Sequence, residues 1–479
     1  MWDRLIHTQP WTIAGGETGD VACDSYHQWH RDVQMVHEMG LKFYRFSISW
    51  PRLLPNAFPT KISESGKKYY NNLINALLDK GIEPIVTLYH WDLPQKLQDL
   101  GGWTNPLITD WFADYATVVF SLFADRVTTW ITINEPNMMC DLNYNLARFA
   151  PMILEPEMAG LLCNKHVLVA HAKAWRIYDK LYKPTYHGKM SIANQVMWIA
   201  PKTADDEEIA EFARQGCNGL YSHAIYSKEG GWPPSIEKAM ARYSKKAGYA
   251  RSKLPAFTKE EILLVRGAYD FYGINYYTAR LARRTLPGED PGVWFVTGYP
   301  EFNITLEIDP KWKVVGHAAA PSYPEGLRKN IAWLRKQYGD LDFFITENGC
   351  GTPDFYDHQR MEYIHDHLEQ VLLSIHEDGA NITAYTYWTL MDNFEWLNAY
   401  TIKFGLYEVD FADPKRIRTP RASAHYYSRI ISENSLDVPY TSRKSFHTRH
   451  HHHKTRNSGN ISSYDPFFSV ISVFLICIL

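Results

Sequence analysis

Short runs of strand-forming residues alternate with longer helical patterns between about residues 42 and 392. Such alternation is typical of a parallel sheet whose strands are joined by helices. The predicted strands are 42–50, 83–91, 128–135, 189–197, 269–277, 342–347 and 382–390. Apolar residues at spacings of three and four predict helices at 67–80, 108–123, 166–181 and 360–378. The pattern therefore predicts an α/β chain, and 479 residues suffice for one (β/α)8 TIM barrel with insertions.

The predicted strands end in polar or aromatic residues rather than apolar ones. These residues are Arg45, Trp50, His90, Trp91, Asn134, Glu135, Asn275, Tyr277, Glu347 and Trp388. In a (β/α)8 barrel the C-terminal ends of all strands converge on one face, which carries the chemistry. We therefore expect these side chains to meet in one cleft.

Two of these residues are acids at strand ends. Glu347 follows Phe-Phe-Ile-Thr and precedes Asn-Gly, a turn signal, and Glu135 lies between Asn134 and Pro136. Taken alone, each acid is ordinarily a surface residue in a turn. Together, on one barrel face, they indicate cleavage of a glycosidic bond, in which one acid protonates the leaving oxygen and the other attacks or activates water. Asn134 could bind a sugar hydroxyl near the reacting carbon.

Composition argues against nucleic-acid binding and gives no sign of a metal or redox site. The net charge is −3 without a basic stripe, which argues against nucleic acid as a partner. Aromatic residues make up 14%, and flat rings commonly bind sugars, although an aromatic-rich core would also account for them. The six cysteines show no C-x-x-C spacing, so no metal site, redox site or cofactor is predicted, and the redox compartment stays open.

The two ends of the chain differ in character. No apolar segment follows Met1, so the sequence as given predicts no signal peptide. Residues 437–479 read as a low-complexity tail rich in His, Ser and Arg, which follows a predicted catalytic domain at 1–436. The tail finishes with a mostly apolar run at 466–479, too short to span a bilayer and of the length of a removable lipid-anchor signal.

Several longer motifs accompany the two acids. They are GDVACD at 19–24, YRFSISW at 44–50, LYHWDLP at 88–94, Asn-Glu-Pro at 134–136, Thr-Glu-Asn-Gly at 346–349, and the stretch from Trp388 to Trp396. With these motifs in this order, the chain from about residue 2 to 431 resembles the family 1 glycoside hydrolases, which include β-glucosidases, lactase-like enzymes and plant myrosinases.

The resemblance implies a retaining exo-β-glycosidase, most simply a β-glucosidase without cofactor or metal. It implies Glu135 as acid/base and Glu347 as nucleophile, with Arg45 favouring the charged form of Glu347 and Tyr277 orienting it. The sugar-binding residues that it implies are His90, Asn134, Asn275, Trp388 as a stacking floor, Glu395 and Trp396. Plant myrosinases carry Gln where this chain has Glu135, which favours O-glycosides, and Glu395 favours a neutral sugar over a phosphorylated one.

The chain departs from the family at its start. The resemblance implies an opening strand followed by a sugar-binding Gln, and neither is present, so the sequence resembles an N-terminally truncated member. We therefore expect a barrel without its first strand. Two alternatives stay open: a non-catalytic relative that binds a glycoside or a protein, and a thioglucosidase. The expected partner is a small β-glycoside or oligosaccharide, with no nucleic acid and no membrane span, and the resemblance implies secretion; the oligomeric state is left open.

Overall fold

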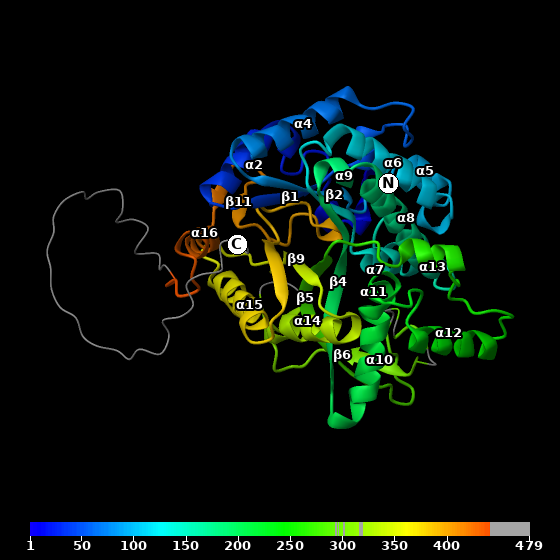
Figure 1. The fold of residues 1–479 in the computed structure, drawn as a ribbon. Helices are drawn as coiled ribbons and strands as arrows, with labels where there is room; N and C mark the ends of the chain where they lie inside the picture. Colours follow the sequence, from blue (N-terminus) through cyan, green and yellow to red (C-terminus); the bar gives the residue numbers. More distant parts are fainter. Residues whose placement is uncertain (293–294, 296, 300–301, 316–319, 441–479) are drawn as a thin grey trace, which may run out of the picture.

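A curved parallel sheet forms the centre of the protein (Figure 1). The computed structural model describes residues 1–440 apart from 293–294, 296, 300–301 and 316–319. The parallel strands, in spatial order, are β1 (Phe43–Ser47), β2 (Glu83–Tyr89), β3 (Thr129–Asn134), β4 (Lys189–Pro201), β5 (Tyr272–Arg284), β9 (Asp342–Asn348) and β10 (Asn381–Tyr387). All the strands predicted from the sequence are present, and the predicted barrel fold is confirmed.

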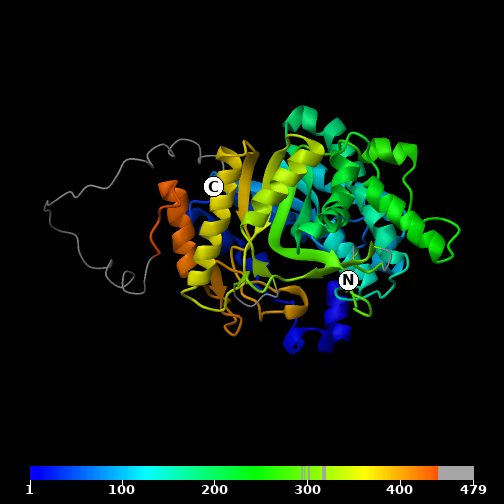
Figure 2. The ribbon, with the colours of Figure 1, turned by 90° about the horizontal axis from the view of Figure 1, so that it is seen from below.

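Helices surround this sheet on its outer side (Figures 1 and 2). The longer helices are α2 (Ser25–Glu38), α4 (Glu64–Asp79), α6 (Ile108–Phe123), α8 (Ala159–Leu181), α10 (Glu207–Cys217), α12 (Pro234–Lys246), α14 (Glu325–Tyr338), α15 (His358–His376) and α16 (Ala422–Glu433). The shorter ones are α1 (Trp2–Thr8), α3 (Trp50–Leu53), α5 (Gln95–Asp99), α7 (Pro136–Met139), α9 (Lys183–Tyr186), α11 (Gly219–Tyr226) and α13 (Lys259–Val265).

Local sequence explains where a typical outer helix begins and which face it buries. At the start of α4 the Ser63 hydroxyl accepts a hydrogen bond from the Gly66 amide at 3.2 Å, which satisfies one of the unpaired amides of the first turn. The apolar residues Leu73, Ile74 and Leu77 then recur at helical spacing and are buried against the sheet.

Apolar side chains fill the interior of the barrel. Each parallel strand, or the residue directly before it, contributes one of them. These side chains belong to Phe43, Ile85, Ile131, Ala193, Phe271, Phe344 and Ala384. They form a cluster separate from the larger core between sheet and helices, as expected when inward residues of a small barrel pack in layers. The polar side chains at the C-terminal ends of the strands therefore lie above a close-packed apolar layer.

The barrel is open between β1 and β10. No described residue of β1 pairs with β10, and a cavity of about 90 Å³ lies between them, lined by both strands. Every residue of β1 is partly exposed when backbone and side chain are taken together, whereas β2 is buried except at its first residue. For the part of the chain that the structure describes, the expected absence of one barrel strand is confirmed. We call this opening the seam.

Two strands are longer than the sequence predicted. The predictions ended at residues 197 and 277, but β4 continues to Pro201 and β5 to Arg284. The end of β5 pairs with the antiparallel strand β6 (Ile304–Glu307), so the extension is stabilised by a partner distant in sequence. Short hairpin strands β7 (Lys313–Val314) with β8 (Pro321–Ser322), and β11 (Tyr407–Val409) with β12 (Arg418–Pro420), complete the strand set.

A disulfide joins Cys140 to Cys163 and ties the segment after β3 to α8. The spacing of the cysteines gave no prediction for this pair. Among the residues that the structure describes, no helix is both long and apolar enough to cross a membrane. Of the predicted tail, 441–479 lies outside the described residues.

Candidate active site

Two glutamates stand at the C-terminal ends of their strands and line one cleft of about 280 Å³. Glu347 belongs to β9 and is 4% exposed. Glu135 directly follows β3 and has φ 45° and ψ 58°, in the left-handed region that non-glycine residues rarely adopt. Pro136 then begins α7, since its fixed φ suits the first turn of a helix. Strained backbone of this kind clusters at functional sites.

Glu347 is held by two side chains from other strands. Arg45 of β1 donates to Glu347 Oε1 at 2.6 Å, and both side chains are almost completely buried. The Tyr277 hydroxyl of β5 donates to Glu347 Oε2 at 2.8 Å. Burial and the neighbouring carboxylates raise the pKa of Tyr277 well above its usual range, so it stays a donor. Each carboxylate oxygen of Glu347 therefore has a fixed partner.

A chain of hydrogen bonds connects the two glutamates. Asn275 Nδ2 donates to Glu135 Oε1 and to Asn134 Oδ1, both at 3.0 Å. Arg45 Nη2 donates to the same Asn134 oxygen at 2.7 Å, and its Nη1 reaches Glu347. Asn275 Oδ1 in turn accepts from the Thr346 hydroxyl at 2.6 Å. The two acids thus belong to one positioned network rather than to separate turns.

The acids differ in their electrostatic surroundings. Burial, and then the negative charge of Glu347, raise the pKa of Glu135 well above that of an ordinary carboxyl. Glu347, by contrast, has a buried ion pair with Arg45. The two carboxyls therefore differ in their surroundings, which is the condition under which two acids of one site can take different roles.

His90 is neutral and has a defined tautomer. Burial lowers the pKa of His90 to about 3, with Arg45 adding to the effect. Because Asn134 Oδ1 accepts from Arg45 and Asn275, its Nδ2 must be the donor to His90 Nε2 at 3.1 Å. The proton of the imidazole is therefore on Nδ1, which can donate to a hydroxyl group.

Aromatic rings form the side of the cleft next to His90. The His90 ring lies 5.8 Å from Trp388, and Trp396 stacks on Trp91 at 4.8 Å. Glu395 lies in the same loop as Trp396, and burial followed by the charge of Glu347 raises its pKa to about 7. Glu395 is therefore only partly ionised near neutral pH. It would repel a phosphate less than a fully ionised carboxylate does, so the expected preference for a neutral sugar is weaker.

The structure brings all the predicted catalytic and sugar-binding residues to this region. Trp50, also expected in the cleft, is not among them, because β1 ends at Ser47 and Trp50 begins α3, where its ring stacks on Tyr115 in the core. Eight of them line the cleft: His90, Asn134, Glu135, Tyr277, Glu347, Trp388, Glu395 and Trp396. The remaining two, Arg45 and Asn275, contact the glutamates through the bonds described above. The cleft also contains residues that the sequence analysis did not single out, among them Met138, Gln195, Met197 and Arg280. Arg280 was missed because the strand was predicted to end at Tyr277.

Gly349 allows two loops of the site to approach closely. The sequence suggested a turn after Glu347, but β9 continues through Asn348. Asn348 is buried, and its side-chain Nδ2 donates to the Tyr276 carbonyl at 2.7 Å. A Cβ at residue 349 would lie 1.9 Å from the Trp388 carbonyl oxygen. Glycine is therefore required at 349 so that this segment can pack against the loop of Trp388, which forms part of the aromatic side of the cleft.

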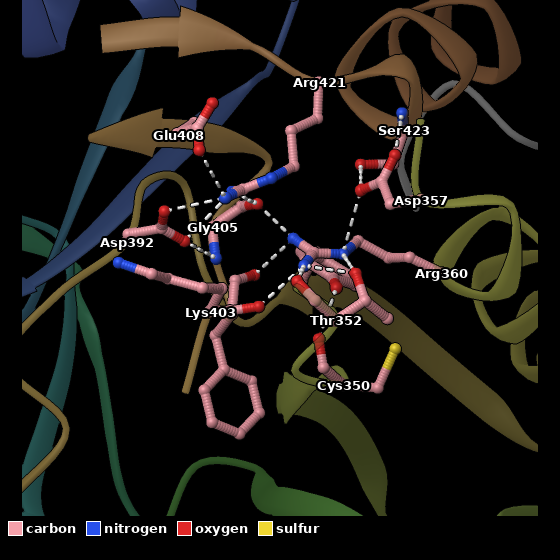
Figure 3. A network of polar contacts seen from close by, with 12 residues as sticks. Cys350, Thr352, Asp357, Arg360, Asp392, Lys403, Gly405, Glu408, Arg421 and Ser423 are labelled. Atoms are coloured by element: carbon pink, nitrogen blue, oxygen red, sulfur yellow. Dashed lines mark hydrogen bonds and ion pairs between the residues drawn. The ribbon is translucent and has the colours of Figure 1, made fainter. Parts of the chain in front are cut away.

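A buried polar network supports the loops behind this wall (Figure 3). Arg360 of α15 donates to the Lys403 and Phe404 carbonyls at 2.7 and 2.8 Å and also to the Gly405 carbonyl. Arg421 pairs with Asp392 through two bonds of 2.9 and 2.8 Å, and both side chains are fully buried. Since Phe404 lines the cleft, the network fixes part of its boundary.

Removing one member of this network is expected to cost stability. Asp392→Ala leaves the Arg421 guanidinium buried without its bidentate partner, and we expect the free energy of unfolding to fall by about 3–5 kcal/mol. The matched control is Glu408→Ala, because Glu408 is 3.9 Å from the same guanidinium and its side chain is 43% exposed. That change should cost about 0–1 kcal/mol. Urea unfolding measures both, and equal losses would contradict a special role for the buried pair.

Comparisons with known proteins give consistent matches over nearly the whole described chain. The sequence profile of Glycosyl hydrolase family 1 matches residues 1–436. The chain is 43% identical to Myrosinase 1 from Brevicoryne brassicae over 437 residues, which are 90% of this chain and 92% of that protein. It is 38% identical to the cytosolic beta-glucosidase of Cavia porcellus over 446 residues, 92% of this chain and 93% of the relative. The solved structure of an aphid myrosinase superposes with a TM-score of 0.86 at 43% identity, covering 90% of this chain and 92% of the other.

Proposed function

The chain belongs to glycosyl hydrolase family 1, and from this premise we propose that it is a retaining exo-β-glycosidase that removes terminal β-D-glucosyl residues. Relatives named beta-glucosidase and myrosinase support hydrolysis of a β-glycoside. The observation that carries the proposal is the network in which Glu135, with a raised pKa, and Glu347, paired with Arg45, are linked through Asn275 and Asn134.

In the first step Glu347 is the nucleophile. A carboxylate oxygen of Glu347 attacks the anomeric carbon, and the bond from that carbon to the aglycone oxygen breaks. Glu135 gives its proton to the departing oxygen, so the aglycone leaves as a neutral alcohol or phenol. The sugar is then joined to Glu347 by an ester bond, and its configuration is inverted.

In the second step Glu135 acts as a base. The negative charge of Glu347 is consumed in the ester, and this charge is the second largest cause that raises the pKa of Glu135. The pKa of Glu135 therefore falls, and its carboxylate can take a proton from water. The water oxygen attacks the anomeric carbon and releases Glu347, and the second inversion restores the β configuration.

The other side of the cleft would bind the sugar itself. His90 carries its proton on Nδ1 and can donate to a hydroxyl, and Asn134 is positioned next to Glu135 to reach a hydroxyl near the reacting carbon. Trp388 offers an aromatic face for the ring of the sugar. Glu395 and Trp396 share one loop at the same side and would bind the outer hydroxyl groups.

A thioglucosidase is the second candidate. The specific observation in its favour is the 43% identity to Myrosinase 1 over most of both chains. A sulfur leaving group needs less help from an acid than an oxygen does, whereas Glu135 provides that acid here. We therefore propose the O-glycosidase first and use a glucosinolate as the comparison substrate.

We also propose that the protein works in an oxidising compartment. The buried Cys140–Cys163 disulfide supports this proposal, since such bonds persist in secreted proteins and are rare in the cytosol. This agrees with the secretion that the family resemblance implied. One relative, from Cavia porcellus, is by contrast named cytosolic, so location differs within the family or the disulfide is particular to this chain.

Product analysis tests the proposed function. The protein is incubated with an aryl β-glucoside, and the first anomer of free glucose is recorded by proton NMR. We expect the β anomer, because two inversions restore the starting configuration. A parallel reaction with a glucosinolate measures the thioglucosidase activity as kcat/KM.

Three results would count against the proposal. An α anomer as first product would show inversion and contradict the role of Glu347. A glucosinolate preferred over every aryl glucoside would favour the second candidate. A folded protein, judged by a cooperative thermal transition, that turns over neither substrate would be a non-catalytic glycoside-binding or protein-binding relative, and the open seam would then be the first feature to investigate.

A further inference from the structure

Two asparagines in the described chain lie in the same tripeptide, Asn-Ile-Thr, at residues 303–305 and 381–383. An asparagine followed two positions later by Thr or Ser is an acceptor for an N-linked oligosaccharide when the chain enters a secretory compartment. A third such tripeptide, at 460–462, lies outside the described residues. Because the first two tripeptides are identical in sequence, a difference between them comes from their places in the fold.

Asn303 lies in an exposed turn between two buried residues. Phe302 and Ile304 are 6% and 1% exposed, whereas Asn303 itself is exposed. The Phe302 ring packs edge-on against Phe212 with centroids 5.1 Å apart, and Ile304 begins β6, which pairs with the end of β5. Asn303 has φ 55°, a conformation that asparagine tolerates better than most residues. Its neighbours therefore hold the backbone in place at this exposed position.

The side chain of Asn303 can carry a substituent without loss of a contact. It makes no hydrogen bond to another described residue, and it does not line the cleft that contains the two glutamates. An oligosaccharide joined to Asn303 Nδ2 would therefore extend into solvent. The folded chain would keep all the interactions that it has around this turn.

Asn381 is also exposed, but its side chain is engaged. It is the first residue of β10 and lies opposite Asp342, the first residue of β9, in the parallel register. Its Nδ2, the atom to which a sugar would be joined, donates to Asp342 Oδ1 at 2.6 Å. Lys189, the first residue of β4, lies 3.9 Å from the other oxygen of that carboxylate. A sugar on Asn381 would therefore compete with this hydrogen bond and crowd two charged side chains.

We propose that Asn303 carries an N-linked oligosaccharide and that Asn381 does not. This inference rests on the proposed oxidising compartment and is independent of the proposed hydrolysis of a glycoside. The donor is an oligosaccharide joined to a lipid diphosphate. The bond between the first sugar carbon and the diphosphate oxygen breaks, the same carbon forms a bond to Asn303 Nδ2, and Nδ2 releases one proton as the lipid diphosphate leaves.

The oligosaccharide must be attached before this region folds. Thr305 completes the acceptor tripeptide, and in the folded chain it is 7% exposed, with its hydroxyl donating to Thr285 Oγ1 at 3.2 Å. A transferase that recognises this hydroxyl can reach it only before β6 pairs with β5. Folding then leaves an oligosaccharide on Asn303 in solvent, whereas one on Asn381 would oppose the contacts among the first residues of the strands.

The test identifies the occupied asparagines by mass spectrometry. The full chain is produced in insect cells behind a cleavable signal peptide and is isolated from the secretory membranes and the medium. Enzymatic removal of the oligosaccharide in water enriched in the heavy oxygen isotope converts each occupied asparagine to a labelled aspartate. We expect the label at Asn303 in most molecules and at Asn381 in few. The peptides are analysed separately, so a label at Asn460 does not interfere.

Asn303→Asp and Thr305→Val are matched variants that both remove the first acceptor tripeptide. Aspartate also tolerates a positive φ, and valine has the shape of the buried threonine. Each variant should migrate faster than the unchanged chain on a denaturing gel, by one oligosaccharide, and enzymatic removal should abolish the difference. The controls are Thr305→Ser, which keeps the tripeptide, and Asn381→Asp, and both should migrate like the unchanged chain.

Two results would overturn the inference: no label at Asn303, or a label that is equally frequent at Asn303 and Asn381. Hydrolysis of an aryl β-glucoside is measured on the same samples. The Asn303→Asp variant should keep the kcat/KM of the unchanged chain, because Asn303 does not line the cleft. Failure of the unchanged chain to hydrolyse the glucoside would refute the proposed glycosidase function and leave the assignment of the acceptor intact.

Discussion

Glu347→Gly is expected to reduce kcat for an aryl β-glucoside by at least about 10⁴-fold, because the residue that forms the covalent intermediate is removed. Arg45 and Tyr277 would keep their places around the vacated volume, since each is anchored by its own strand. Steady-state release of the aryl group measures the loss. A cooperative thermal transition in the variant shows that the loss is chemical rather than structural.

Added azide should partly restore turnover of this variant. Azide is small enough to enter the space left by the carboxylate and attacks the anomeric carbon from that side. A carbon–nitrogen bond forms as the aryl oxygen departs, so the product is an α-glucosyl azide, with inverted configuration. The matched control is Glu395→Gly, which removes another carboxyl group of the same cleft. Azide should give no α-glucosyl azide there, and its absence in Glu347→Gly too would refute the assignment of the nucleophile.

Glu135→Gln is expected to reduce kcat/KM by about 10²–10⁴-fold for a substrate with a poor leaving group, because no proton reaches the departing oxygen. With 2,4-dinitrophenyl β-glucoside, whose aryl oxide needs no proton, the first step should be nearly unaffected. A burst of dinitrophenolate followed by slow turnover would be observed, since the second step also lacks its base. Equal losses for both substrates would contradict a role as the acid.

Glu135→Gln should also change how kcat/KM depends on pH. In the unchanged protein Glu135 must be protonated, so kcat/KM falls as the pH rises through its pKa. Burial and the charge of Glu347 raise that pKa, so the alkaline decline should lie well above the range of an ordinary carboxyl, about 4.3. In Glu135→Gln, measured with the same substrate that carries a poor leaving group, the residual activity should show no such alkaline decline. Its persistence would assign the titration to another group.

The strands could be predicted from the sequence because each one is a short, continuous segment with its own pattern of apolar residues. The segment around Glu347 illustrates this: Phe343, Phe344 and Ile345 are apolar and buried, and the acid comes at the end. The strand-end residues of the cleft followed from the convergence of strand ends in a barrel, whereas Glu395 and Trp396 were implied by the resemblance to the family. Local sequence therefore indicates which strand-end side chains meet in the cleft.

The remaining features depend on contacts between distant parts of the chain. The length of β5 depends on its pairing with β6, and the direction of Arg280 depends on a bulge opposite β4. Neither has a signal within a short window of sequence. The Cys140–Cys163 bond joins two segments that only the tertiary fold brings together. The need for glycine at 349 likewise comes from the Trp388 carbonyl rather than from the turn that Asn-Gly suggested.

The seam between β1 and β10 affects how the protein behaves at high concentration. Along the described part of these strands the seam leaves backbone groups that a closed barrel would pair, and such edges can accept a strand from another molecule. The half-buried apolar side chains of β1, Phe43 and Phe46, would favour the same contact. Self-association through this opening would raise the risk of aggregation at high protein concentration. Because the cavity between β1 and β10 is also lined by Arg45 and Trp388, a strand bound there would lie close to residues of the candidate active site.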